Sequence, residues 1–230
     1  MPSKKTTDVY AAFSNLTDYC PMLSVSRLSA ERADRTLFTD LSFALHAGQC
    51  LHLRGANGAG KTTLLKMLAG LSLAQAGEIT WQGKALAAWG DDYYAALHYL
   101  GHKEGLKDLL SPRANLRLTA DISGQILSEA AALKTLAQVG LIRQCDLAVR
   151  SLSQGQKKRA ALARLLAISR PLWLLDEPFV GLDQAAQNQL GEWIDQHNRD
   201  GGIVILTSHQ ALPQAIQNIS ELDLSQGSAA

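Results

Sequence analysis

The chain has 230 residues, of which 47% are hydrophobic and 19% are charged. This composition supplies enough apolar material for one large domain with its own core, and it excludes a largely disordered chain. Lysine and arginine together number 22 and aspartate and glutamate 21, so the formal net charge is +1. Because nucleic-acid-binding proteins usually carry a clear basic excess, we expect no nucleic acid among the partners.

Three scattered cysteines, Cys20, Cys50 and Cys145, show no zinc-ligand spacing. This odd set argues against a disulfide framework and is typical of a reducing compartment. The sequence contains no run of about 18 uncharged apolar residues that would cross a bilayer, and residues 1–21 lack the apolar region of a secretory signal. We therefore expect a cytoplasmic protein that contacts a membrane only through its partners.

The first segment, residues 1–21, is polar and irregular and ends in a proline. We interpret it as a disordered extension, or as an overextended gene start with Met22 as the true initiator. From Met22 the run MLSVSRL alternates as a strand does. A second strand-like run, LFTDLSFAL, follows before a turn at Ala47 and Gly48.

A short strand at residues 49–54 runs directly into a glycine-rich loop, and residues 61–69 carry leucines at helical spacing before a terminating Gly70. The loop satisfies the P-loop pattern, in which glycines let backbone N–H groups wrap phosphate oxygens at a helix N-terminus. Lys61 is expected to reach the β- and γ-phosphates, and Thr62 to hold Mg²⁺. The residues expected to bind nucleotide here are Gly55, Ala56, Asn57, Gly58, Ala59, Gly60, Lys61, Thr62 and Thr63.

The remaining pattern alternates between strands and helices. Residues 77–84 predict a strand and a turn, residues 104–150 are mainly helical, and residues 172–175 and 203–207 predict buried strands. Buried apolar strands separated by helices indicate a parallel α/β sheet. The stretch at about 104–168 then forms a helical insertion into that sheet.

Two acids, Asp176 and Glu177, follow the apolar strand at residues 172–175. An acid at the C-terminal end of a parallel strand lies beside the P-loop, where Asp176 is suited to hold the magnesium shell. Glu177, the next residue, is suited to polarise the attacking water as general base.

The run Leu152-Ser153-Gln154-Gly155-Gln156 predicts the start of a helix, with Ser153 as its N-cap. A P-loop, this LSxGQ run, an apolar strand ending in Asp-Glu, Asp183 and a final strand leading to His209 follow one another along the chain. This ordered set resembles the ABC ATPase family, and the resemblance covers residues 22–210.

The resemblance implies an α/β fold of the P-loop NTPase type. It implies a single ABC ATPase domain at residues 22–230, with a parallel core sheet, an antiparallel β subdomain and a helical subdomain at about 104–168. The implied cofactors are ATP and Mg²⁺, with Thr62 and Asp176 as the metal-holding residues.

The resemblance also implies a second chain. Ser153 and Gly155 would contact ATP bound to the opposite subunit, so a working site needs a head-to-tail homodimer. Asp183 would lie in the loop that crosses this interface. His209 would contact the γ-phosphate and act in catalysis together with Glu177 and Lys61.

Two positions depart from the family pattern. Lys103 occupies the place of a glutamine that ligands Mg²⁺; an ammonium group cannot ligand a metal, although it can still meet the γ-phosphate. Arg32 replaces the aromatic residue that stacks on adenine, and a guanidinium group can also stack on a base. The other histidines show no ligand spacing and are interpreted as structural: His46, His52, His98, His102 and His197.

Local runs such as Tyr99-Leu100-Gly101-His102 and Leu172-Trp173 resemble the ATPase subunits of cytochrome c maturation complexes. This implies membrane subunits such as CcmB and CcmC, a place at the cytoplasmic face of the inner membrane, and release of the heme-loaded chaperone CcmE by ATP hydrolysis. Two alternatives stay open: an ATPase subunit that imports or exports another small substrate, and a soluble ABC ATPase without a transport role.

The start of the helical insertion, residues 104–118, is expected to grip the membrane subunit, because it leaves the nucleotide site at the γ-phosphate sensor. Leu106, Leu109 and Leu110 recur at helical spacing there. They either line one exposed helical face or are buried in a small core of the insertion itself.

Overall fold

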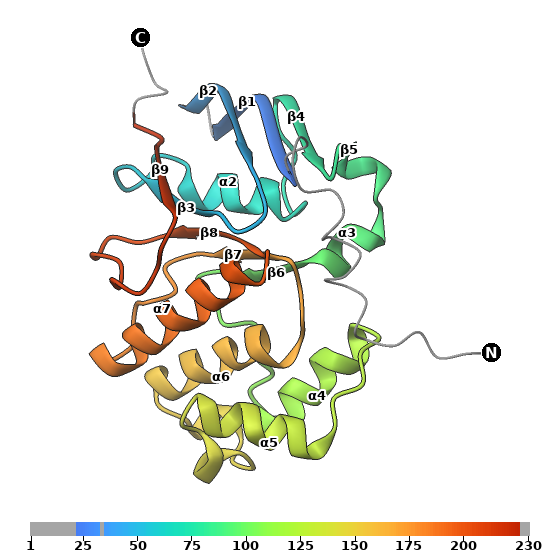
Figure 1. Ribbon diagram of the computed structural model, residues 1–230, viewed down its shortest axis with the longest axis vertical. Coiled ribbons are helices and arrows are strands. Elements are labelled where there is room, and N and C mark those ends of the chain that lie inside the picture. Colours follow the sequence, from blue (N-terminus) through green and yellow to red (C-terminus); the bar gives the residue numbers. More distant parts are fainter. Residues whose placement is uncertain (1–21, 33–34, 226–230) are drawn as a thin grey trace, which may run out of the picture.

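A computed structural model describes residues 22–32 and 35–225 of the chain (Figure 1). The expectations for residues 1–21, Cys20 included, lie outside the described residues. The central sheet has five strands in the order β6-β7-β8-β3-β9, and every neighbouring pair is parallel. These strands are β3 (Cys50–Arg54), β6 (Leu97–Leu100), β7 (Leu172–Leu175), β8 (Ile203–Thr207) and β9 (Ile219–Asp223). The predicted parallel α/β sheet is confirmed.

Both faces of the central sheet are buried, which explains why its inner strands are continuous apolar runs. Leu172 and Leu174 of β7 belong to the core cluster on one face, whereas Trp173 and Leu175 belong to the cluster on the other. The helix α2 (Lys61–Leu68) packs into the first cluster. The helices α6 (Gln154–Ala167) and α7 (Gln184–Arg199) pack into the second.

The second sheet is antiparallel, with four strands in the order β2-β1-β4-β5. Its strands are β1 (Leu23–Arg32), β2 (Arg35–Leu45), β4 (Ala76–Trp81) and β5 (Lys84–Ala85). Alternate residues of β1, such as Leu23 and Val25, enter the same core cluster as the apolar face of α2. In Figure 1, α2 accordingly lies between the two sheets, and in the chain it follows the loop that leaves β3.

A third group of helices lies within residues 104–168. The helices α4 (Pro112–Ile122) and α5 (Glu129–Gln138) pack against α6 around a separate cluster that includes Leu116, Leu136 and Ala160. Shorter elements complete the fold: α3 (Asp91–Ala96) and the 3₁₀ helices η1 (Leu86–Ala88), η2 (Ile142–Gln144) and η3 (Val149–Ser151). The boundaries of one ATPase domain at 22–230 and of its helical subdomain stay predictions.

Of the two alternatives for Leu106, Leu109 and Leu110, a shared helical face is wrong. Those residues lie in an irregular stretch, and the helix begins only at Pro112, with Ser111 as N-cap accepting a hydrogen bond from the Ala114 N–H. Proline disfavours a helical conformation in the residue before it, so a helix cannot run smoothly through Ser111. The leucines separate accordingly: Leu109 is 76% exposed, whereas Leu106 packs partly against two core clusters.

Among residues 22–32 and 35–225, no helix combines the length and the apolar character needed to cross a bilayer. Both cysteines in this part of the chain are free thiols, Cys50 buried and Cys145 half-buried.

Candidate nucleotide-binding site

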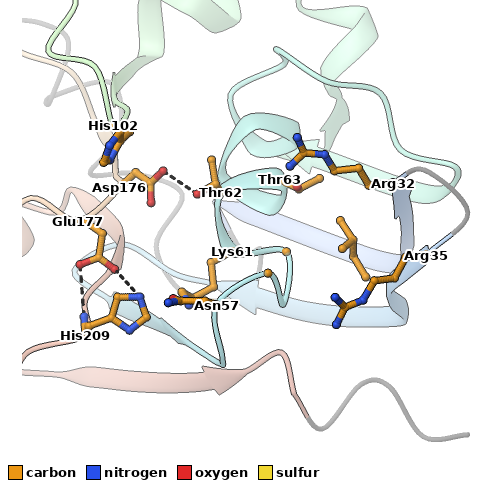
Figure 2. A pocket seen from close by; sticks show the side chains of 13 residues that line it. Arg32, Arg35, Asn57, Lys61, Thr62, Thr63, His102, Asp176, Glu177 and His209 are labelled. Atoms are coloured by element: carbon orange, nitrogen blue, oxygen red, sulfur yellow. Dashed lines mark hydrogen bonds and ion pairs between the residues drawn. The ribbon is translucent and has the colours of Figure 1, made fainter.

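A cavity of about 420 Å³ opens at the carboxyl ends of the parallel strands (Figure 2). The loop after β3, the two acids after β7 and the residues that follow β6 and β8 all meet there. This edge is where open α/β sheets generally bind their ligands. The residues that line the cavity are Arg32, Arg35, Leu37, Asn57, Gly58, Gly60, Lys61, Thr62, Thr63, His102, Asp176, Glu177 and His209.

The loop between β3 and α2 depends on glycine. Gly60 is the N-cap of α2, has a φ of 101° and makes no side-chain cap, and a Cβ there would lie 3.1 Å from Phe38. Gly58 also has a positive φ, of 84°. The first N–H groups of α2 therefore face the cavity without a capping side chain, which is the arrangement that binds phosphate groups.

Lys61 folds back over the glycine-rich loop. Its Nζ donates hydrogen bonds to the carbonyl oxygens of Gly55, at 2.7 Å, and Ala56, at 3.2 Å. The residue is 9% exposed, so its charge is held at the cavity wall, where its partners among the described residues are these two loop carbonyls. Gly55, Ala56 and Ala59 are not among the lining residues, and the first two instead anchor this lysine.

A chain of hydrogen bonds joins α2, β7 and β8. The Thr62 hydroxyl donates to Asp176 Oδ2 at 2.8 Å, and the Thr207 hydroxyl donates to Asp176 Oδ1 at 2.9 Å. The Asp176 N–H in turn donates to the Leu100 carbonyl of β6 at 2.8 Å. Asp176 is only 5% exposed, so its carboxylate position is fixed from three elements.

The oxygen atoms of Thr62 and Asp176 fit a magnesium site. Both are hard donors that converge on the cavity, and Mg²⁺ in nucleotide sites usually takes one or two protein oxygens and completes its shell with water and phosphate. Over the described part of the chain, no group of three or more His, Cys, Asp or Glu residues is arranged to hold a metal by itself.

Glu177 adopts a left-handed backbone conformation, with φ of 49°, that is uncommon outside glycine. Its N–H donates to the Thr207 hydroxyl at 2.8 Å, and its carbonyl accepts from Lys158 Nζ at 3.1 Å. The carboxylate accepts a 3.3 Å bond from the His209 N–H, and the His209 Nε2 lies 3.4 Å from its other oxygen (Figure 2). The sequence-predicted acid and histidine therefore lie together in the cavity.

The LSxGQ run forms the predicted helix start. Ser153 is the N-cap of α6, and its hydroxyl and the Gln156 side chain form a reciprocal capping box. A Cβ on Gly155 would lie 3.1 Å from the Gly181 carbonyl, which places the run against the turn before Asp183, itself the N-cap of α7. None of Ser153, Gly155 and Asp183 lines the cavity.

Lys103 was expected in the site, but the cavity is lined by the residue before it, His102, and Lys103 is exposed. The Lys103 side chain therefore lies outside the cavity. His102, which was interpreted as purely structural, lines the cavity instead. Arg32 does line the cavity, as its predicted contact with the base requires.

Three further polar residues of the site escaped the sequence analysis. Arg35, at the start of β2, lines the cavity beside Arg32, and Thr207 orients both Asp176 and Glu177. A hydroxyl residue at the end of a predicted strand was the available signal for Thr207. Lys158 reaches Glu177 from α6, and burial lowers the pKa of its ammonium group.

The comparisons with known proteins agree with this geometry. Residues 38–180 match the family model described as ABC transporter. The chain is 48% identical over 203 residues to the cytochrome c biogenesis ATP-binding export protein CcmA of Dechloromonas aromatica (strain RCB), covering 88% of this chain and 100% of that protein. It is 44% identical over 209 residues to the protein of the same name from Escherichia coli (strain K12), covering 91% and 99%.

Solved structures show the same fold. The structure titled "Structure of ATP binding subunit of ABC transporter" aligns with a TM-score of 0.72 at 30% identity, over 82% of this chain and 80% of that one. A putative ABC transporter ATP-binding protein from Pyrococcus furiosus aligns with a TM-score of 0.78 at 23% identity, over 90% and 99%. The chain therefore belongs to the ABC transporter ATP-binding family, and its sequence resembles that of CcmA proteins.

Proposed function

We propose that the protein is the ATP-hydrolysing subunit of a membrane ABC complex that handles heme during c-type cytochrome maturation. The observation that carries the ATPase function is the convergence of the glycine-rich loop, the bonded pair Thr62–Asp176 and the pair Glu177–His209 on one cavity. The role in cytochrome c maturation is supported by the name "Cytochrome c biogenesis ATP-binding export protein CcmA", which relatives of nearly full-length coverage share.

In this proposal the loop and the start of α2 bind the phosphates of ATP. Backbone N–H groups from residues 55–63 surround the phosphate oxygens, and Lys61 exchanges the carbonyls of Gly55 and Ala56 for the β- and γ-phosphates. Thr62 and Asp176 hold Mg²⁺, which neutralises phosphate charge when bound. Arg32 and Arg35 extend the same wall of the cavity toward the base and sugar, and Arg32 stacks on the adenine.

Glu177 acts as the general base. Its carboxylate accepts a proton from the water that attacks the γ-phosphate. His209, whose N–H bonds one carboxylate oxygen and whose ring lies 3.4 Å from the other, fixes the carboxylate and contacts the γ-phosphate. The Thr207 bond to the Glu177 N–H keeps the residue beside Asp176. Lys103 approaches the γ-phosphate when the dimer closes.

Two chains are needed for turnover. Ser153, Gly155 and Asp183 lie outside the cavity of their own chain, at the starts of α6 and α7, so they are available to a nucleotide held by a second copy. We propose a head-to-tail homodimer in which the N-terminus of α6 contacts the partner's γ-phosphate.

The partners of that dimer are membrane subunits such as CcmB and CcmC, at the cytoplasmic face of the inner membrane. Residues 104–118 form the docking surface, where Lys107, Asp108 and Leu109 are exposed. ATP hydrolysis would then drive release of the heme-loaded chaperone CcmE.

Deletion of the gene in its own host tests this function. We expect loss of covalently bound heme in c-type cytochromes, accumulation of heme-loaded CcmE, and recovery of both with the wild-type gene but not with Glu177→Gln. Normal c-type cytochromes in the deletion strain would contradict the heme function. Purified wild-type protein that hydrolyses no ATP, alone or with its membrane subunits, would contradict the ATPase function as well.

A further inference from the structure

Lys158 is a buried cation next to the proposed general base. It lies in α6, little more than one helical turn after Ser153, and is 7% exposed. Its Nζ donates a 3.1 Å hydrogen bond to the main-chain carbonyl of Glu177. Its ammonium group also interacts electrostatically with the carboxylates of Glu104, Asp176 and Glu177.

Burying a lysine is unfavourable, because water solvates an ammonium group far better than a protein interior does. Burial is the largest influence on the pKa of Lys158 and lowers it, although the three carboxylates act in the opposite direction. An apolar side chain of the same length would fill this space at a lower free-energy cost of burial. Packing alone therefore does not explain why a charged hydrogen-bond donor lies here.

The conformation of Glu177 supplies a reason. Its φ of 49° lies in the left-handed region, which a glutamate adopts only when its surroundings hold it there. The Val180 N–H donates to its carbonyl at 3.4 Å, and two side chains also hold its main chain: the Thr207 hydroxyl accepts from its N–H at 2.8 Å, and Lys158 donates to its carbonyl at 3.1 Å. The two clamps come from different elements, β8 and α6.

We infer that Lys158 is a positioning residue that holds the main chain of Glu177 so that its carboxylate faces the attacking water, and that links this base to the helix carrying the LSxGQ run. The inference rests on the proposed function, in which Glu177 is the base and Ser153 contacts the partner's nucleotide. Because Ser153 and Lys158 lie on the same rigid helix, occupancy of the opposite site is transmitted to the base through the bond to the Glu177 carbonyl.

The test replaces Lys158 with methionine, which keeps the length and removes the donor and the charge. The matched control is Lys157→Met, because Lys157 precedes it in the same helix, is half-exposed and makes no side-chain hydrogen bond to the described residues. For the full-length Lys158→Met protein we expect kcat for ATP to fall at least tenfold, KM to stay within twofold, and the melting temperature to match that of the control. Lys157→Met should keep wild-type kcat.

A second measurement separates positioning from folding or nucleotide binding. In a Glu177→Gln background, Lys158→Met should still form the dimer with Mg-ATP in size-exclusion chromatography, because nucleotide binding does not need the clamp. A kcat within twofold of wild type, or loss of that dimer together with kcat, would overturn the assignment of Lys158. If the wild type itself hydrolyses no ATP, the proposed function is wrong, and the role of Lys158, which rests on it, is wrong as well.

Discussion

The Thr62 hydroxyl donates a 2.8 Å hydrogen bond to Asp176, although 114 residues separate them in the chain. The bond joins the first turn of α2 to the end of β7, and Asp176 is in turn bonded to Thr207 at the end of β8. Three elements that the chain forms far apart thus fix one carboxylate at the cavity.

Lys61→Ala is expected to lower ATP turnover at least about 100-fold, since removing one donor that stabilises transition-state charge costs about that much in kcat. The fold should survive, because in the described part of the chain the Lys61 ammonium bonds just two loop carbonyls, those of Gly55 and Ala56. Phosphate release measures turnover, and circular dichroism and the melting temperature serve as controls. A variant with near wild-type turnover would contradict the proposed phosphate contact.

Glu177→Gln keeps the shape of the side chain and can still accept the His209 N–H, but it cannot take a proton from water. We expect the variant to bind ATP without cleaving it and to accumulate as a dimer. Size-exclusion chromatography with Mg-ATP should show that dimer, which the wild type forms only briefly. ADP in place of ATP is the control, and an elution volume unchanged by Mg-ATP would argue against the two-chain site.

Arg32→Ala is expected to raise KM for ATP about threefold to tenfold with little change in kcat, because a stacked guanidinium contributes about 0.5–1 kcal/mol or more to a contact of this kind. Arg32→Tyr should recover the wild-type KM by supplying an aromatic ring instead. Arg143→Ala, at an exposed position outside the cavity, is the control. An unchanged KM in Arg32→Ala would remove Arg32 from the nucleotide site.

The stability of the fold should depend on pH through a buried histidine of α7, on the face of the central sheet that α6 and α7 cover. His197 stacks on Trp173 with ring centroids 4.0 Å apart, and burial lowers its pKa to about 4. The unfolded chain, with a histidine pKa of about 6.5, then binds more protons than the folded one, so stability is lost as the pH falls below about 6.5 toward 4.

Replacing the His197 imidazole with a group that does not titrate should make the loss of stability at acid pH smaller. Between pH 6 and 4.5 the free energy of unfolding of His197→Gln should fall less steeply than that of wild type, by about 1.4 kcal/mol per pH unit. Urea unfolding at several pH values measures the slope, which does not depend on how much the substitution destabilises the protein at neutral pH. His46→Gln, at an exposed position, should keep the wild-type slope, and equal slopes for wild type and His197→Gln would refute the linkage.

Much of the site could be predicted because its signals are local. Glycine spacing predicts the loop at residues 55–61. Apolar runs predict β7 and β8, and therefore predict that Asp176 and Glu177 follow the carboxyl end of β7. Ser153 could be predicted as an N-cap because capping depends on a few consecutive residues. These features need no knowledge of how distant elements pack.

The errors arise where packing or backbone direction decides. One of the two alternatives put Leu109 on an exposed helical face, but Ser111 is the N-cap and the helix begins only at Pro112. Which of His102 and Lys103 faces the cavity depends on the turn after β6. Lys158 contacts Glu177 because α6 packs against the end of β7, and no local sequence pattern predicts such a contact.

The proposed docking surface can be tested at Lys107 and Asp108. Both side chains are exposed, while the backbone around them is held from elsewhere: the buried Asn115 side chain bonds both the N–H and the carbonyl of Lys107, and the Arg150 N–H donates to the Asp108 carbonyl. Reversing both charges, Lys107→Glu with Asp108→Lys, therefore changes the surface without loosening the loop and leaves the net charge of the chain as it was.

We expect this double variant to lose copurification with the membrane subunits while keeping the ATPase activity that the purified chain shows without membranes, because neither side chain lines the nucleotide cavity. The control reverses two exposed charges on other helices, Lys134→Glu on α5 with Glu192→Lys on α7, and should copurify as wild type does. The physical reason for the difference is that like charges brought together at an interface repel each other and lose their favourable partners. If the double variant still brings down the membrane subunits in wild-type amounts, the docking surface lies elsewhere than residues 104–118.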